Sequence, residues 1–272
     1  MTLEQIEPTL RSPNRADYPE LDGYTAEQIY RDSLGPGSLY LTARMARTMH
    51  LRPGDIVLDL GCGCGETSIY LAKRFDVQVV AVDLWTPATD LNDKFTTRGY
   101  RDRITPLHLD ATNELPFADG YFDAIFCMNS FSFYGGSVEF LAHLLKHLKA
   151  GGEFCVGSEG FNAEFMPEER ANPPAPFAWQ HPGGFSIWED DFSKQHSPEW
   201  WKDLFEKSGL LRVTDCFELP DADILFEDTF LHDIERGDDP FDIEKMLEQL
   251  AYNRTHSPHQ TLYVVAAIKL KE

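Results

Sequence analysis

The chain reads Val57-Leu58-Asp59-Leu60-Gly61-Cys62-Gly63-Cys64-Gly65 where an apolar run meets three glycines at alternate positions. The apolar half is typical of a strand buried on both faces. The glycines let the backbone turn tightly and approach a ligand that a Cβ atom would repel. A helical stretch with Ile69 and Ala72 follows, and then a second apolar run at 77–82 that ends in Asp83. This order of strand, glycine loop, helix, strand and acid predicts a ligand-binding α/β domain.

Apolar runs of strand length recur along the rest of the chain, separated by stretches with helical periodicity. They lie at residues 106–109, 122–128, 153–157, 213–219 and 262–270. Between them, Val138, Leu141 and Leu145 fall on one helical face, which indicates an amphipathic helix. Short apolar strands that alternate with helices predict a mostly parallel sheet with both faces covered.

The pattern predicts a single domain with an N-terminal arm and two insertions. Its parts are a helical arm at 1–50, a cofactor-binding core at 51–157, a lid insertion at 158–196, and a C-terminal part of the sheet at 197–272 that includes an acidic helical insertion at 220–258. We expect residues 1–23 to be flexible or loosely packed. Thr25 and Gln28 form a capping box that predicts a short helix, and Ser38 can start a second. The lid insertion is too long for an ordinary connection, so we expect it to cover a substrate.

The spacing of the glycines separates this loop from two common nucleotide-binding loops. A dinucleotide fold has Gly-x-Gly-x-x-Gly, whereas here the third glycine comes one residue early and Glu66 follows directly. An acid at a helix N-terminus repels a pyrophosphate but tolerates an ammonium group. Asp83, at the end of the second strand, is placed to accept ribose hydroxyls. The loop therefore favours a ribonucleoside with a positive charge, and the absence of Gly-Lys-Ser/Thr excludes a phosphate-binding P-loop.

These residues resemble the glycine signature of class I S-adenosylmethionine-dependent methyltransferases. Later motifs agree in order, namely Asp83, Asp110-Ala111, the stretch 115–123 reading LPFADGYFD, and the stretch 145–154 reading LKHLKAGGEF. The resemblance covers residues 38–160 well and 197–215 moderately, and is nearest to the small-molecule branch that includes ubiquinone-type and cyclopropane-synthase-like enzymes. It implies a Rossmann-like, doubly wound, seven-stranded sheet whose last strand is antiparallel. It also implies S-adenosyl-L-methionine as the cofactor.

The resemblance assigns cofactor contacts to nine positions. They are Asp59, Gly61, Gly63, Gly65, Asp83, Leu84, Asp110, Ala111 and Asn129. Asp83 would bind the ribose, Leu84 and Asp110-Ala111 the adenine, and Asn129 would lie beside the methionine part. Other interpretations stay open, because Asp59 can simply orient the glycine loop and Asp110 can cap a helix. Leu84 can also be an ordinary packing residue.

Methyl transfer from a sulfonium is an in-line displacement in which the protein mainly positions the nucleophile and excludes water. A base is needed only if the acceptor arrives protonated, and we expect no metal. The acceptor must lie beyond the carboxyl ends of the strands, which selects Tyr134, Glu159, Tyr24 in the arm and His181 in the lid as catalytic candidates. Histidine is a common general base, although a lone loop histidine such as His181 is more often solvated or structural.

The expected acceptor is a small molecule. Aromatic and acidic residues in the lid favour an amine nitrogen, and oxygen or sulfur acceptors stay open. One alternative is carbon methylation of a lipid, as in cyclopropane synthases, although no basic amphipathic helix is evident. Another is a non-catalytic protein that binds S-adenosylmethionine. Methylation of nucleic-acid bases is disfavoured, since Asn129-Ser130-Phe131-Ser132 does not resemble the Asn/Asp-Pro-Pro-Tyr/Phe signature.

Charge and cysteine content narrow the partners further. The 272 residues include 24 Lys and Arg against 45 Asp and Glu, a formal net charge of −21, and eleven of the acids lie in 220–258. This charge argues against binding to nucleic acid or to anionic membranes. The five cysteines are odd in number and scattered, which does not indicate a disulfide framework. No apolar leader or membrane-spanning run is evident, so we expect a cytoplasmic protein of unspecified oligomeric state.

Overall fold

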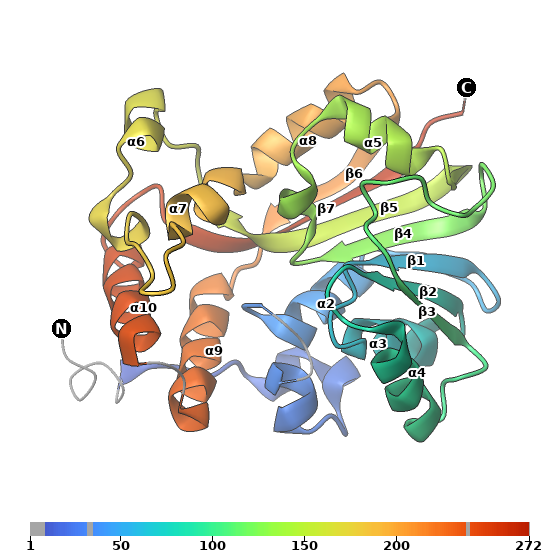
Figure 1. Cartoon of the computed structure of the whole chain (residues 1–272), viewed down its shortest axis with the longest axis horizontal. Coiled ribbons are helices and arrows are strands. Elements are labelled where there is room, and N and C mark those ends of the chain that lie inside the picture. The colour runs from blue at the N-terminus through green and yellow to red at the C-terminus, as the bar shows by residue number, and fades with distance from the viewer. Residues whose placement is uncertain (1–8, 32–34, 238–239, 272) are drawn as a thin grey trace.

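The computed structural model describes residues 9–31, 35–237 and 240–271. A seven-stranded sheet of order β3-β2-β1-β4-β5-β7-β6 runs through the molecule (Figure 1). Its strands are β1 (Ile56–Leu60), β2 (Gln78–Asp83), β3 (Ile104–His108), β4 (Phe122–Met128), β5 (Leu148–Phe161), β6 (Leu211–Glu218) and β7 (Gln260–Lys269). The first five strands in chain order pair in parallel, and β7 runs antiparallel between β5 and β6. The expected Rossmann-like sheet with an antiparallel last strand is confirmed.

Helices cover both faces of this sheet, each over its own hydrophobic core. On one face lie α2 (Ser38–Ala46), α3 (Glu66–Phe75), α4 (Ala88–Thr97) and α9 (Ala222–Arg236). On the other lie α5 (Val138–Leu145) and α8 (Pro198–Lys207), whose Leu141 and Trp201 are buried in the core on that face, and α8 packs against β6 and β7. Ser197 caps α8 by accepting the Trp200 N–H, and the proline at its first position fits the helix start. Because helices cover both faces of the sheet, the side chains of the central strands are apolar on both sides.

The N-terminal arm is more firmly packed than expected. Tyr18 and Leu21 are fully buried in the core on the α2 face, so the expectation of a loose arm over 1–23 is wrong from residue 9 onward, and residues 1–8 lie outside the described part. The arm contains short turns, η2 (Arg15–Asp17) and η3 (Pro19–Leu21), and a π-helical turn, η4 (Glu27–Arg31). The capping box is confirmed: Thr25 N–H donates to Gln28, and Gln28 N–H donates back to the Thr25 hydroxyl.

The lid insertion folds around a small aromatic core of its own. Outside the lid, one further turn, η5 (Phe131–Tyr134), follows β4. The lid itself contains α6 (Pro167–Ala171), η6 (Ala175–Phe177), α7 (Ile187–Asp190) and η7 (Phe192–Lys194). Its core comprises Phe161, Phe165, Phe177, Trp188 and Phe192. In Figure 1 this layer lies beyond the end of β5, next to α10 (Pro240–Asn253). The segment 162–196 thus lies beyond the carboxyl end of β5, and parallel sheets bind ligands at this edge.

The acidic insertion forms two helices, α9 and α10, whereas the apolar periodicity of Ile243, Met246 and Leu250 in the sequence predicts only the second. Its acids hold the arm in place. The Tyr18 hydroxyl donates to Asp221 over 2.6 Å, and the Tyr30 hydroxyl donates to Asp228. Arg11 donates to Glu227 over 2.7 Å, and Glu227 is only 2% exposed. Arm and insertion are therefore one structural layer, although some two hundred residues separate them in the sequence.

Candidate active site

The glycine loop leads from β1 into α3 and lies against the end of β4. Gly61 has a φ of +72°, and a Cβ there would lie 2.4 Å from Oγ of Ser130. That Ser130 hydroxyl donates to the Leu60 carbonyl over 2.8 Å. Gly65 has a φ of +81°, and a Cβ there would lie 2.7 Å from the Phe95 ring. Positive φ and close packing together explain why glycine is needed at these two positions.

Asp83 organises the loop from the end of β2. Its Oδ2 accepts the Gly63 N–H over 2.9 Å, while Oδ1 accepts those of Trp85 and Thr86, each over 2.8 Å. A carboxylate offers about four lone-pair positions, so about one remains open to a ligand. Asp83 thus fixes the backbone around the loop and keeps limited room for a hydroxyl donor.

An exposed apolar pair follows Asp83. Leu84 is 46% and Trp85 76% exposed, which is unusual for side chains of this size beside a buried strand. Across from them, after β3, Asp110 accepts the N–H and the hydroxyl of Thr112 and closes a tight turn. No helix starts there, so the alternative of a helix cap at Asp110 is wrong. Ala111, next to it, is buried in the core on the α5 face.

Two buried acids near the loop have structural partners. Asp59 is 1% exposed, and its Oδ2 accepts the Ser68 hydroxyl over 2.5 Å, which ties β1 to α3. Burial raises its pKa to about 7. Glu66, at the start of α3, is fully buried and forms ion pairs with Lys94 and Arg98 of α4, at 3.2 and 3.1 Å. The negative charge of Glu66 is therefore balanced by these two cations of α4.

Asn129 connects the end of β4 to a cavity. It has a φ of +50°, its Oδ1 accepts the Glu159 N–H over 3.2 Å, and its Nδ2 donates to the Pro36 carbonyl over 3.1 Å. Both Glu159 and Pro36 line a cavity of about 300 Å³. Asn129 directly follows Met128 of β4 and precedes Ser130, which contacts the glycine loop. Two consecutive residues, Asn129 and Ser130, therefore link the cavity to the glycine loop.

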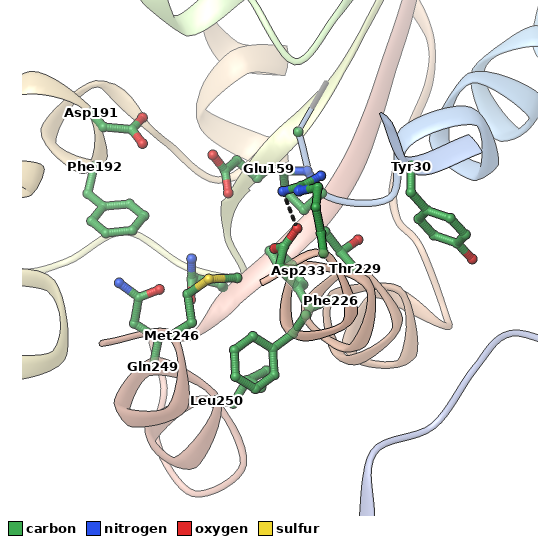
Figure 2. A pocket seen from close by; sticks show the side chains of 15 residues that line it. Tyr30, Glu159, Asp191, Phe192, Phe226, Thr229, Asp233, Met246, Gln249 and Leu250 are labelled. Atoms are coloured by element: carbon green, nitrogen blue, oxygen red, sulfur yellow. Dashed lines mark hydrogen bonds and ion pairs between the residues drawn. The ribbon is translucent and has the colours of Figure 1, made fainter. Parts of the chain in front are cut away.

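The cavity is built from elements far apart in the sequence. Figure 2 shows Tyr30 from the arm, Glu159 from β5, Asp191 and Phe192 from the lid, and side chains of α9 and α10 around it. The helix residues at its wall are Phe226, Thr229, Phe230, Asp233, Arg236, Met246, Gln249 and Leu250. About half of the lining residues are apolar or aromatic and the others are polar or charged, so the cavity can hold both an apolar body and a polar group of a small molecule.

Of the four catalytic candidates, the structure places only Glu159 at this cavity. Tyr134 lies at the glycine loop, where its hydroxyl is 3.4 Å from the position of a Cβ on Gly61, and its ring stacks on Phe140. Burial raises the pKa of Tyr134 well above its usual value. The four candidates therefore do not form one cluster.

Tyr24 and His181 lie elsewhere. Tyr24 packs beside Tyr70 and the Lys73 ammonium of α3. His181 accepts the Gly183 N–H on Nδ1 over 2.8 Å, and its Nε2 is 3.5 Å from Asp242 of α10. His181 therefore contacts the lid backbone and α10, as expected for a histidine with a structural role.

Sequence reasoning missed two polar residues of the lid that accompany Glu159. Asp191 lines the cavity. Gln195 Nε2 donates hydrogen bonds to both Glu159 and Asp191. Neither residue stands in a recognisable motif. The lid was expected to cover a substrate from its composition, but only the folded chain identifies which of its acids face inward.

Comparison with known proteins places the core among methyltransferases. Residues 57–152 match the model of a methyltransferase domain family. Residues 57–152 are a methyltransferase domain. The 27-O-demethylrifamycin SV methyltransferase of Amycolatopsis mediterranei is 31% identical over 118 residues, 43% of either chain. The sarcosine/dimethylglycine N-methyltransferase of Halorhodospira halochloris is 27% identical over 45% of this chain and 44% of its own. The chain thus spans less than half the length of these curated relatives.

A solved methyltransferase structure extends the likeness beyond this domain. The Haemonchus contortus phosphoethanolamine N-methyltransferase 2, in complex with S-adenosyl-L-methionine, has a TM-score of 0.64 at 17% identity. The alignment covers 95% of this chain and 60% of that protein, and at this identity it establishes the shared fold. Within the described residues, no helix combines the length and apolar character that crossing a bilayer requires.

Proposed function

We propose that this methyltransferase domain binds S-adenosylmethionine at the glycine loop and transfers the methyl group to a nitrogen of a small amine. The observation that carries the proposal is the position of Glu159. This carboxylate lies in an aromatic-lined cavity at the carboxyl end of β5, and Asn129 joins that cavity to the glycine loop. Carboxylates among aromatic rings favour cationic nitrogen over neutral or anionic acceptors.

The residues around the loop fit the proposed cofactor. The exposed Leu84 and Trp85 offer an apolar surface for an adenine ring, and Asp83 keeps room for a ribose hydroxyl. Asp110 and Ala111 border the same region after β3, and Gly61, Gly63 and Gly65 let the backbone approach the rest of the molecule. Asp59 acts through Ser68 and the start of α3, as a residue that positions the loop.

The proposed reaction asks little covalent chemistry of the protein. The cofactor supplies a methyl group on a sulfonium, whose sulfur leaves without needing a proton. The cavity aligns the acceptor nitrogen, and the lid and the arm exclude water from it. Nucleophilic attack requires a free lone pair, so an ammonium acceptor must first lose a proton to a nearby base. Glu159 is the candidate base at the cavity.

The acceptor atom can be identified by incubating the chain with S-adenosylmethionine labelled in its methyl group. A panel of small amines, phenols, thiols and carboxylic acids serves as acceptors, and mass spectrometry locates the label. We expect label on nitrogen. Label only on oxygen, sulfur or a lipid carbon would contradict the proposal. Binding of the cofactor without transfer to any acceptor would favour a non-catalytic binding protein.

The cofactor site is tested by titration calorimetry with S-adenosylmethionine. Asp83→Ala removes the acceptor of three backbone N–H groups, one in the glycine loop and two after β2, so the affinity should fall by at least about tenfold. Asp83→Asn keeps an acceptor atom and the side-chain volume, and should fall less. Asp93→Asn changes an exposed acid of α4 by the same charge and should leave the affinity unchanged. Equal affinities for all of these variants would move the cofactor away from the loop.

A further inference from the structure

Two carboxylates meet at one wall of the cavity, joined by a single amide. Gln195 Nε2 lies 3.0 Å from Oε1 of Glu159 and 3.0 Å from Oδ1 of Asp191. A primary amide has two N–H donors, so it can give one to each carboxylate. Gln195 is 1% exposed, whereas both carboxylates line the cavity. The amide therefore holds the two acids from behind and leaves their other oxygens to the cavity.

The lid and the sheet fix this arrangement from both sides. The Gln195 N–H donates to the Phe192 carbonyl over 3.1 Å, and the Gln195 carbonyl accepts from Arg170 over 3.3 Å. On the sheet, Glu159 N–H donates to Asn129. The three polar groups thus come from β5 and from two positions of the lid, and the pair exists only when the lid is folded onto the sheet.

Among the described residues, no lysine or arginine forms an ion pair with Glu159 or Asp191. Gln195 is neutral, so it orients the two carboxylates without compensating their charge. Burial, followed by the neighbouring charge of Asp191, raises the pKa of Glu159, and burial also raises that of Asp191. Two adjacent acids in a partly desolvated site favour either a shared proton or a bound cation.

The other charged or titratable groups near Glu159 and Asp191 compensate their charge only in part. The Lys194 ammonium acts on Asp191 from the same turn and partly offsets its charge. On α9, which also lines the cavity, Arg236 donates to Asp233 over 2.8 Å, so a positive and a negative charge lie together there (Figure 2). Tyr30 of the arm also lines the cavity, and Tyr263 of β7 lies near Glu159. Both are neutral at ordinary pH, because burial raises their pKa values.

We infer that Glu159 and Asp191, held side by side by Gln195, bind the ammonium group of the acceptor and that Glu159 receives its proton. The inference rests on the proposed function and names the chemical class of its acceptor, a small aliphatic amine that is protonated in solution. Gln195 is a positioning residue in this scheme. The apolar wall at Phe192, Phe226 and Phe230 receives the body of the amine, and a volume of about 300 Å³ limits its size.

The proton transfer balances with the proposed methyl transfer. An N–H bond of the ammonium breaks, and an O–H bond forms on Glu159, which leaves a neutral amine with a free lone pair. The nitrogen then bonds to the methyl carbon as the carbon–sulfur bond breaks, and that electron pair stays on sulfur. The product is again a cation, with one methyl group more, and the proton on Glu159 leaves to solvent after release.

Recognition of the cation can be measured without any catalysis by titrating the chain with choline. Choline carries a fixed positive charge and cannot lose that charge or accept a further methyl group on nitrogen. 3,3-Dimethylbutan-1-ol has the same shape without the charge. We expect choline to bind at least about tenfold more tightly than the neutral alcohol. Equal binding of the two, or no binding of choline at millimolar concentration, would overturn the inference.

Substitutions then assign the binding to the pair. Glu159→Gln and Asp191→Asn should each weaken choline binding by about tenfold while binding of the neutral alcohol stays unchanged. Glu189→Gln is the matched control, because Glu189 is an exposed acid of the same lid that does not line the cavity. An equal loss in Glu189→Gln would show that general lid charge, and not the pair, attracts the cation.

The role of Gln195 is tested by the pH dependence of choline binding. Binding should strengthen as pH rises, because the pair must ionise to hold the cation. Gln195→Leu removes the N–H donors that favour the ionised acids, so the midpoint should move upward by about one pH unit. A structural role alone would weaken binding equally at every pH. These titrations need no methyl transfer, so their failure is distinguishable from failure of the labelling experiment.

Discussion

Asp59 is a buried acid whose charge has incomplete compensation. Ser68 donates to its Oδ2, whereas Oδ1 has no hydrogen-bond partner among the described residues. Burial, opposed by the Ser68 hydrogen bond and supported by the charge of Asp83, raises its pKa to about 7. The folded chain therefore binds a proton at Asp59 more tightly than the unfolded chain does.

The consequence is a measurable pH dependence of stability. A raised carboxyl pKa stabilises the folded state at low pH, and this contribution is lost as pH rises from about 4 to about 7. We expect Asp59→Asn to remove this decrease in the free energy of unfolding, which amounts to at most about 4 kcal/mol over the whole range. Urea unfolding between about pH 4 and about pH 8 measures the slope, with Asp93→Asn as the control. An unchanged slope in Asp59→Asn would mean that another group titrates.

Individual site residues differ in how well the sequence identified them. Gly61, Gly65 and Asp83 were predictable, because a positive φ and a strand-terminal carboxylate leave local signatures. Gln195 left none, since its importance comes from two acids that reach it from β5 and from the lid. His181 had the most suggestive chemistry of the lid, yet its contacts are with lid residues and α10.

At the scale of elements, the acidic helix α9 binds the arm. Arg11 donates to the buried Glu227 and to the exposed Asp223, each over 2.7 Å. Arg254 of the segment after α10 also donates to Glu227 over 2.8 Å. Tyr30, which lines the cavity, is held by Asp228 of the same helix. Asp221, Asp223, Glu227 and Asp228 of the acidic insertion thus have partners in the arm.

Removing one of these partners should loosen the arm. Arg11→Ala leaves Glu227, which is 2% exposed, with Arg254 as its remaining charged partner. We expect a loss of about 1–3 kcal/mol in the free energy of unfolding and faster proteolysis of the arm. Lys207→Ala removes an exposed pair with Asp203 and should cost less than about 1 kcal/mol. If both substitutions lower the free energy of unfolding equally, the contact between Arg11 and Glu227 does not stabilise the arm specifically.

The elements themselves were predicted unevenly. β1, β2 and β4 were predictable as continuous apolar runs, and the capped start of α8 was predictable from Ser197-Pro198. The extension of β5 to Phe161 was not, because Ser158–Phe161 has no apolar run and becomes a strand by pairing with β7. α9 was also missed, since its buried face includes Glu227 and Asp228, which weaken the apolar periodicity.

For the whole molecule, the net charge of −21 predicts what the chain does not bind. We expect no measurable binding to duplex DNA or to anionic phospholipid vesicles at physiological salt, because both require clustered cations. Fluorescence anisotropy with labelled DNA and cosedimentation with vesicles check this expectation. A neutral vesicle is the control for charge-independent adsorption. Salt-sensitive binding to either polyanion would contradict it.

The sequence by itself determined the sheet and the loop of this protein. Strands buried on both faces and glycines at alternate positions are local patterns, and their physical causes act within a few residues. Only the tertiary structure decided the acceptor cavity. Tyr30, Glu159, Asp191 and Asp233 come together there from the arm, the sheet, the lid and α9. Their chemistry depends on burial and on shared partners such as Gln195, and these arise when distant segments pack against one another.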